Sequence, residues 1–261
     1  MNRLLELGRA GQPLPLAGIT DMHGHLGRYA FAIPALTPAS VVRGMDRLGV
    51  ARTVCSHMRC MSADVVRGNR EVWAAMREFP GRILGYASVW PASARQVRDE
   101  VNWAVDHGFV GLKLHNANGF SYQAPAYEPA YAVANERHWP VLFHTWGEAK
   151  VLDEVRVLAR QYPDAVFLTA HAGCGNEEGY IQLARDCANV YLDPCLSRAP
   201  RGLFDRFAHA IGADRIVWGS DVLFLSQAQQ LGRILGARIN DADKRLILAT
   251  NAGRILARTI A

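Results

Sequence analysis

The sequence contains no long hydrophobic run, because its apolar stretches fall short of the roughly 18 to 20 residues that a membrane span needs. The opening residues, MNRLLELGRAGQ, also lack the long apolar stretch of a secretory signal, so a cytoplasmic protein without a membrane partner is expected. The five cysteines are odd in number and form no CxxC pair, which disfavours both a disulfide framework and a cysteine zinc site.

Lysine is scarce, since only 3 of the 29 basic residues are Lys and the other 26 are Arg. The arginines are scattered and form none of the basic runs of about 5 to 8 residues that mark nucleic-acid patches, so nucleic acid is not an expected partner. Half of the residues are hydrophobic and a fifth are charged, which is typical of a globular protein. We find no compositional break and expect one domain over 1–261, in which 1–17 form an arm or short helix.

Short β-branched runs alternate with longer amphipathic stretches, which indicates parallel strands covered by helices. We expect eight strands, over 18–23, 51–57, 82–89, 109–115, 140–145, 165–171, 189–193 and 215–220. We expect helices over 62–79, 93–107, 148–161, 176–187, 201–211, 226–236 and 241–257. Eight strand–helix units in about 260 residues predict an α/β fold of the (β/α)8 TIM-barrel type with a C-terminal helix. The alternative is a doubly wound open sheet, but no GxGxxG or Walker sequence follows any strand.

Several of these strands end on a side chain that can bind a metal. The first runs into His23-Gly24-His25, whose two imidazoles share one face of an extended chain. The fifth ends at His144, the sixth at His171, and Asp221 follows the eighth. Along the chain these ligand candidates are separated by about four, one and two strand–helix units, at roughly 30 residues per unit. A TIM barrel brings the carboxyl ends of its strands together at one face, so these side chains can meet there.

Neutral imidazoles and one carboxylate suit a borderline divalent ion such as Zn²⁺. A catalytic site of this kind keeps one position open for water, whose pKa falls to about 7 on zinc, and a neighbouring carboxylate can take the proton. The set therefore predicts a metal centre built from His23, His25, His144, His171 and Asp221.

A second group of residues lies where it could face a substrate. Lys113 shares a strand face with His115 among apolar neighbours, and a buried Lys needs a partner or a function. It could bind a substrate anion, become carboxylated and bridge two metals, or form a salt bridge at the barrel mouth. Histidines that end strands can line the pocket, a Trp that follows a strand can form its wall or simply pack, and arginines can supply positive charge. These expected substrate-binding residues are Lys113, His115, His57, Arg28, Trp146 and Arg198.

The ordered set of motifs resembles the amidohydrolase superfamily of metal-dependent hydrolases. The resemblance is closest to the amidohydrolase-related group that also contains aminocarboxymuconate semialdehyde decarboxylase. The tail Asn251-Ala252-Gly253-Arg254-Ile255-Leu256 looks like the terminal helix motif of that group. The residues that carry the resemblance are Asp21-Met22-His23-Gly24-His25, His144, His171 and Gly219-Ser220-Asp221.

The resemblance implies a distorted TIM barrel with one or two divalent ions, commonly Zn²⁺. It implies that His23, His25, His144 and Asp221 bind the principal ion, that His171 binds a second ion or polarises the substrate, and that Asp221 also shuttles protons. The Lys-Leu-His context of Lys113 is more like that of single-metal relatives, so one ion per chain is expected, with a second as the alternative.

These observations favour a hydrolase that attacks a small-molecule ester, amide or lactone with a metal-activated water. The first alternative is non-oxidative decarboxylation of an aromatic or unsaturated carboxylic acid, although decarboxylases of the family are usually longer than this chain. The second alternative is a non-catalytic metal-binding barrel. A small-molecule substrate is the expected partner, and a homo-oligomer is compatible with the sequence.

Overall fold

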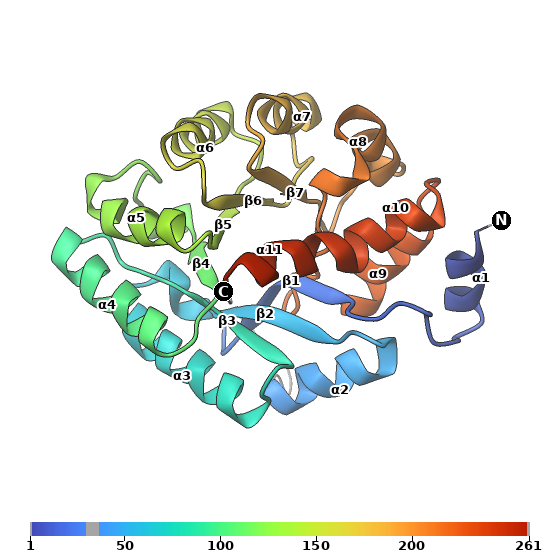
Figure 1. Cartoon of the computed structure of the whole chain (residues 1–261), viewed down its shortest axis with the longest axis horizontal. Helices are drawn as coiled ribbons and strands as arrows, with labels where there is room; N and C mark the ends of the chain where they lie inside the picture. The colour runs from blue at the N-terminus through green and yellow to red at the C-terminus, as the bar shows by residue number, and fades with distance from the viewer. Residues whose placement is uncertain (1, 30–36, 260–261) are drawn as a thin grey trace.

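A computed structural model describes residues 2–29 and 37–259. Seven parallel strands follow one another in chain order around a curled sheet, and helices cover its outer side (Figure 1). The expected α/β fold of the TIM-barrel type is therefore confirmed. The strands are β1 (Thr20–Leu26), β2 (Arg52–His57), β3 (Ile83–Ala87), β4 (Gly111–Leu114), β5 (Pro140–His144), β6 (Val166–Ala170) and β7 (Val190–Asp193).

The expected eighth strand over 215–220 is not formed as a regular strand, and in this respect the prediction was wrong. The segment still connects the two edges of the sheet. The Val217 amide donates to the Leu192 carbonyl of β7 at 2.9 Å, and the Met22 amide of β1 donates to the Trp218 carbonyl at 2.9 Å. The segment pairs only through isolated bridges, of Ile216 with Leu192 and of Val222 with Gly24, and between them the chain turns sharply at Asp221, whose φ is +55°. The ring is consequently distorted where its first and last units meet.

Helices lie at all the stretches where the sequence predicts them, and α1 lies in the expected N-terminal arm. Two helices, α2 and α5, were not predicted. The helices are α1 (Arg3–Arg9), α2 (Pro38–Leu48), α3 (Val65–Glu78), α4 (Ala94–Asp106), α5 (Glu128–Glu136), α6 (Ala149–Gln161), α7 (Glu177–Asp186), α8 (Leu203–Ile211), α9 (Gln227–Leu235), α10 (Asp241–Arg245) and α11 (Asn251–Thr259). A π-helical turn, Leu246–Thr250, joins the last two into one C-terminal unit.

The missed helix α2 has clear local determinants. The Ser40 amide donates to Oγ1 of Thr37 at 3.2 Å, and the Thr37 amide donates to the Ser40 hydroxyl at 3.0 Å, which forms a capping box. At its other end Gly49 adopts φ +70°, a conformation that favours glycine. Local polar contacts rather than a long apolar stripe therefore set the limits of this helix.

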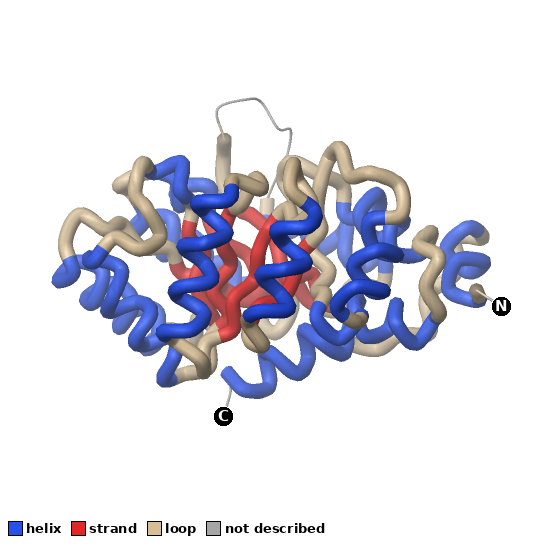
Figure 2. Tube along the Cα trace, turned by 90° about the horizontal axis from the view of Figure 1, so that it is seen from above, coloured by secondary structure: helices blue, strands red, loops and turns tan. Residues whose placement is uncertain are grey.

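The interior of the curled sheet is packed, and α11 closes one end of it. Side chains that point inward from the strands, such as Leu142 and Leu168, form a buried cluster with Ile255 and Leu256 of α11. The cluster includes Val110, next to the start of β4, so α11 covers the amino-terminal end of the strands. Figure 2 shows this helix lying across that end, with the strands inside the layer of helices. The site can therefore form only at the opposite, carboxyl-terminal end.

Across residues 2–29 and 37–259, the structure contains no helix with both the length and the apolar character required to cross a membrane.

Candidate metal centre

Strand β1 carries two histidines whose rings converge. Nε2 of His23 lies 3.1 Å from Nε2 of His25, and both residues are buried. The pairing of β1 with β2 shifts register between Asp21 and Gly24, and a bulge of this kind re-aims side chains near functional sites. Gly24 itself lies so close to β2 that a Cβ there would be 2.6 Å from Oγ1 of Thr53. The glycine between the histidines is thus required by close strand packing.

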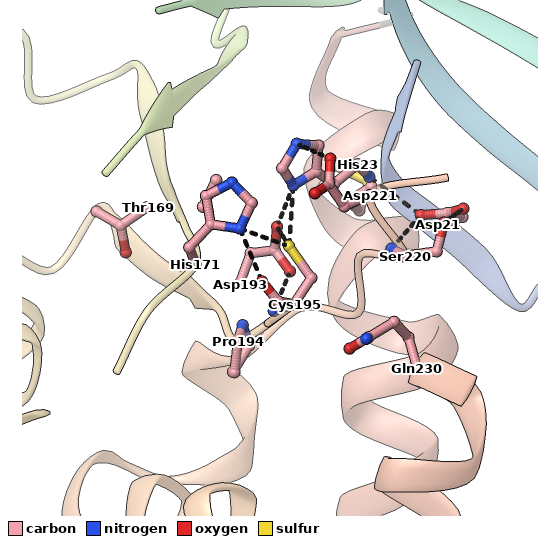
Figure 3. A network of polar contacts seen from close by, with 12 residues as sticks. Asp21, His23, Thr169, His171, Asp193, Pro194, Cys195, Ser220, Asp221 and Gln230 are labelled. Atoms are coloured by element: carbon pink, nitrogen blue, oxygen red, sulfur yellow. Dashed lines mark hydrogen bonds and ion pairs between the residues drawn. The ribbon is translucent and has the colours of Figure 1, made fainter. Parts of the chain in front are cut away.

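Asp221 completes a triangle of possible ligand atoms. Its Oδ1 lies 3.2 Å from Nε2 of His25 and 3.5 Å from Nε2 of His23. The Asp221 amide donates to the His23 carbonyl at 2.7 Å, which fixes the turn beside β1 (Figure 3). Ligands about 2.0 to 2.1 Å from a tetrahedral zinc ion are separated by roughly 3.3 Å. The three atoms are therefore spaced as the ligands of a single ion would be.

His171 lies beside this triangle, because one of its ring nitrogens is within 4.8 Å of ligand atoms of both His23 and Asp221. His171 and Asp221 also share a rare backbone conformation, with φ of +62° and +55°. Residues other than glycine adopt this conformation at a cost of about 1 to 3 kcal/mol and do so most often at functional sites. The surrounding structure therefore holds both residues in place against a local conformational preference.

The other ring nitrogen of each imidazole contacts a protein atom. Such contacts orient the rings of metal-binding histidines and make Nε2 available to an ion. The pairs are His23 Nδ1 with Oδ2 of Asp193 at 2.7 Å, His25 Nδ1 with Oγ of Ser56 at 2.9 Å, and His171 Nδ1 with the carbonyl oxygen of Cys195 at 2.8 Å.

Protonation states match what metal binding requires. Burial lowers the pKa of His23, His25 and His171, so the imidazoles are neutral and keep a lone pair. Burial alone would raise the pKa of Asp221, but its contacts with the imidazoles outweigh burial and hold the pKa below its usual range. Metal ligands must be neutral imidazoles and ionised carboxylates, so this set fits a divalent cation.

Asp21 links β1 to the segment around Ser220 and Asp221 through hydrogen bonds. Its carboxylate accepts hydrogen bonds from the Ser220 amide at 2.8 Å, the Ser220 hydroxyl at 2.5 Å and Nε2 of Gln227 at 3.0 Å. Burial raises the pKa of Asp21 to about 6, and these hydrogen bonds oppose that rise. The residue holds β1 against the segment that carries Asp221.

Lys113 reaches the centre from β4. It lies opposite Leu142 in the sheet, on the inward-facing side, and its side chain is almost completely buried. Its Nζ is 3.2 Å from Nε2 of His23, and burial lowers its pKa. The basic group therefore lies beside the proposed ligand atoms.

His144 and His115 form a stacked pair at the ends of β5 and β4, with ring centroids 3.7 Å apart. The His144 ring lies 4.8 Å from that of His171, between centroids. Burial lowers the pKa of His115 to about 2 and lowers that of His144 as well. His144 therefore borders the centre, and its role as a ligand stays a prediction.

The remaining candidates lie at the rim of the site or behind it. Trp146 is 46 % exposed and stacks on His171 with centroids 4.8 Å apart, which places it where a pocket wall is expected. Arg28 and Arg198 are exposed on loops after β1 and β7. Their contribution to substrate binding stays a prediction.

His57 contacts protein atoms through both ring nitrogens. Nδ1 accepts a hydrogen bond from the Arg59 amide at 3.1 Å, and Nε2 lies 2.7 Å from Oε2 of Glu71. His57 also lines a cavity of about 640 Å³ together with Arg28. The contact of Nε2 with Glu71 joins the end of β2 to α3, whereas Nδ1 caps the short turn Met58–Met61. The predicted substrate contact would have to displace one of these partners.

A second group of possible ligands consists of His23 and two side chains behind its ring, Asp193 and Cys195. However, Nδ1 of His23 is 2.7 Å from Asp193, which is a hydrogen-bond distance and shorter than the roughly 3.3 Å between two ligands of one ion. Asp193 was not among the site residues predicted from the sequence. The available signal was that Asp193 ends the strand expected over 189–193.

The family model for amidohydrolases matches residues 20–258, and the chain belongs to this family. The resemblance drawn from the sequence motifs is therefore confirmed. A search of curated protein sequences gave no match.

Solved structures confirm the fold and span several reactions. A probable 2-pyrone-4,6-dicarboxylic acid hydrolase from Acinetobacter baumannii, with citric acid bound, has a TM-score of 0.73 and 15 % identity, over 92 % of this chain and 99 % of that one. 2,6-Dihydroxybenzoate decarboxylase from Rhizobium has a TM-score of 0.69 and 15 % identity, over 92 % and 98 %. 5-Carboxyvanillate decarboxylase from Novosphingobium aromaticivorans, complexed with manganese, has a TM-score of 0.68 and 14 % identity, over 84 % and 79 %.

Proposed function

We propose that this protein is a metal-dependent hydrolase that cleaves a small-molecule ester, amide or lactone. The observation that carries the proposal is the buried triangle of His23 Nε2, His25 Nε2 and Asp221 Oδ1, with separations of 3.1 to 3.5 Å. We propose one Zn²⁺ per chain, held by these residues with His144 or His171 as further ligands. Manganese is the alternative, because the 5-carboxyvanillate decarboxylase structure contains it.

A divalent ion bound here would supply Lewis acidity, lowering the pKa of a water molecule and polarising a substrate carbonyl. Asp221 is the base in this proposal, since its carboxylate is ionised and can accept a proton and return it to the leaving group. His171 lies beside His23 and Asp221 and can orient the carbonyl oxygen.

Substrate selection is assigned to the residues around this centre. Lys113 can bind an anionic group of the substrate, because it is a buried basic group 3.2 Å from His23. Trp146 and the stacked His115 present flat surfaces against which a planar substrate can pack. Arg28 and Arg198 lie on exposed loops and can attract carboxylates from solution. These features support a small, anionic molecule rather than a nucleic acid as the partner.

The second candidate is non-oxidative decarboxylation of an aromatic or unsaturated acid. Lys113 favours it, because a buried basic group beside the centre can hold a carboxylate in the orientation from which carbon dioxide leaves. Two of the similar structures are decarboxylases by name, although identities of 14 to 15 % support the shared fold alone.

The deciding experiment combines metal analysis with a substrate screen. The purified protein is stripped with a chelator, reloaded with Zn²⁺ or Mn²⁺, and assayed against lactones, esters, amides and aromatic acids. Base consumption at constant pH reports hydrolysis, and release of labelled carbon dioxide from carboxyl-¹³C acids reports decarboxylation. Metal-dependent hydrolysis supports the proposal, and metal-dependent carbon dioxide release replaces it with the second candidate. Stoichiometric metal binding without turnover across the panel would favour a non-catalytic barrel.

A further inference from the structure

We propose that Asp193 is a positioning residue that keeps the proton of His23 on Nδ1 and so prepares Nε2 to bind a metal. The inference rests on the metal centre proposed above. Asp193 ends β7 and is completely buried, and its Oδ2 lies 2.7 Å from Nδ1 of His23 (Figure 3).

The Asp193 carboxylate is held by donors from one neighbouring residue. The Cys195 amide donates to Oδ1 at 3.3 Å, and the Cys195 thiol donates to Oδ2 at 3.1 Å. With Oδ1 engaged by an amide, Oδ2 is the oxygen presented to His23. An imidazole N–H at 2.7 Å from a carboxylate oxygen forms a charge-assisted hydrogen bond, which is stronger than a bond to a neutral acceptor.

Gly219 makes this close approach possible. A Cβ at residue 219 would lie 2.5 Å from Oδ1 of Asp193 and 2.6 Å from Cβ of His23. Both distances are shorter than any van der Waals contact, so a side chain here would push the carboxylate and the imidazole apart. The glycine that precedes Ser220 and Asp221 thus has a steric role at the back of the His23 ring.

The three imidazoles differ in what orients them. The His25 ring contacts the Ser56 hydroxyl, and the His171 ring contacts the Cys195 carbonyl, and both of these partners are neutral. Of the three partners, Asp193 alone is a carboxylate. It follows that the tautomer of His23 depends on a charged partner, whereas those of His25 and His171 depend on neutral partners. Loss of Asp193 should therefore weaken metal binding more than loss of Ser56.

The sharpest test is Asp193→Asn, which preserves the shape of the side chain. The Cys195 amide needs an acceptor at the Oδ1 position, so the new amide oxygen is directed there and the new NH₂ group faces Nδ1 of His23. An N–H donor facing Nδ1 favours the opposite tautomer, with the proton on Nε2, where it blocks the metal. Loss of such a partner typically lowers metal affinity about 10- to 100-fold.

Two measurements are made on wild type, Asp193→Asn, Asp193→Ala and the controls Ser56→Ala and Cys195→Ala. In the metal-free proteins, ¹⁵N NMR of the histidine rings identifies which nitrogen of His23 carries the proton. Competition with a chromogenic chelator then gives the dissociation constant for Zn²⁺. Circular dichroism confirms that each variant is folded.

We expect the wild-type proton on Nδ1, an inverted tautomer and an affinity loss of about 10- to 100-fold in Asp193→Asn, and smaller losses in both controls. Cys195→Ala keeps the backbone amide that holds Oδ1 of Asp193, and it removes the thiol, which lies 3.1 Å from both Oδ2 of Asp193 and Nδ1 of His23. It therefore tests whether losing this thiol has the same effect as losing the carboxylate. A folded Asp193→Asn protein with an unchanged tautomer and an unchanged dissociation constant would overturn the inference. If wild type itself binds no metal, the proposed function fails instead, while the tautomer measurement still tests the role of Asp193.

Discussion

Oδ1 of Asp221 lies 3.2 Å from Nε2 of His25, although the two residues come from opposite ends of the sequence. They meet because the segment after β7 makes backbone hydrogen bonds to β1, including one from the His25 amide to the Val222 carbonyl at 2.9 Å. Closure of the barrel and assembly of the centre are therefore the same structural event.

Replacing Asp221 with Asn should remove most of the turnover while leaving the fold intact. The variant keeps the shape of the side chain but cannot accept the proton, and loss of a general base typically costs about 10²- to 10⁴-fold in rate. Steady-state kinetics on the substrate found in the screen measures the effect, with thermal denaturation as the control for folding. A variant with the wild-type rate would exclude Asp221 as the base.

Removal of the metal should lower the thermal stability of the protein. An ion that binds only the folded state at 100 times its dissociation constant stabilises it by about 2.7 kcal/mol. For a chain of this size that corresponds to a shift in Tm of roughly 5 to 10 °C. Differential scanning fluorimetry with and without Zn²⁺ measures the shift. His25→Ala should lose most of it, and an equal shift in that variant would place the ion elsewhere.

The metal-free protein should become less stable as the pH falls from 7.5 to 5.5. Burial lowers the pKa of buried histidines such as His25, His57 and His171, so below about 6.5 the unfolded chain binds protons that the folded chain does not. Each such group then removes up to about 1.4 kcal/mol of stability per pH unit.

Two buried carboxyl groups have the opposite effect on the pH dependence of stability. Burial raises the pKa of both Asp21 and Asp193 to about 6, so the stability they contribute is present below their unfolded pKa of 3.8 and is lost as the pH rises through about 6. The histidines are more numerous, so their effect dominates. Urea denaturation at pH 7.5, 6.5 and 5.5 tests this expectation, and a midpoint that stays constant or rises on acidification would contradict it.

A pair of glycine substitutions separates steric necessity from general effects of adding a methyl group. Gly219→Ala should destabilise the protein and weaken metal binding, because the new Cβ would lie 2.5 Å from Asp193 and 2.6 Å from His23. Gly253→Ala is the matched control, since its Cβ would meet no atom within 4 Å and it lies in helix α11. The control should be neutral or stabilising by up to about 1 kcal/mol, as expected for Gly to Ala in a helix. Equal effects on the urea midpoint would contradict the steric role of Gly219.

The sequence allowed the fold class to be predicted because its signals are local. Short continuous apolar runs mark buried strands such as β5 and β6, and helical spacing marks α4 and α6. Two helices were missed for local reasons as well. Helix α2 is defined mainly by the Thr37–Ser40 capping box, and α5 is only nine residues long with Pro129 in its first turn. The eighth strand is irregular because a 3-10 turn, Ala213–Arg215, overlaps its expected start, and the residues after it pair with β7 and β1 only through isolated bridges.

For the site, the sequence by itself determined which residue types stand at the strand ends, including His23, His25 and Asp221. Only the tertiary structure decided which atoms face one another. Whether an imidazole presents Nδ1 or Nε2 depends on the neighbour behind the ring, and for His23 that neighbour is Asp193 on a distant strand. No periodicity in the chain encodes this choice, because it arises when the first and last strands of the curled sheet are brought together.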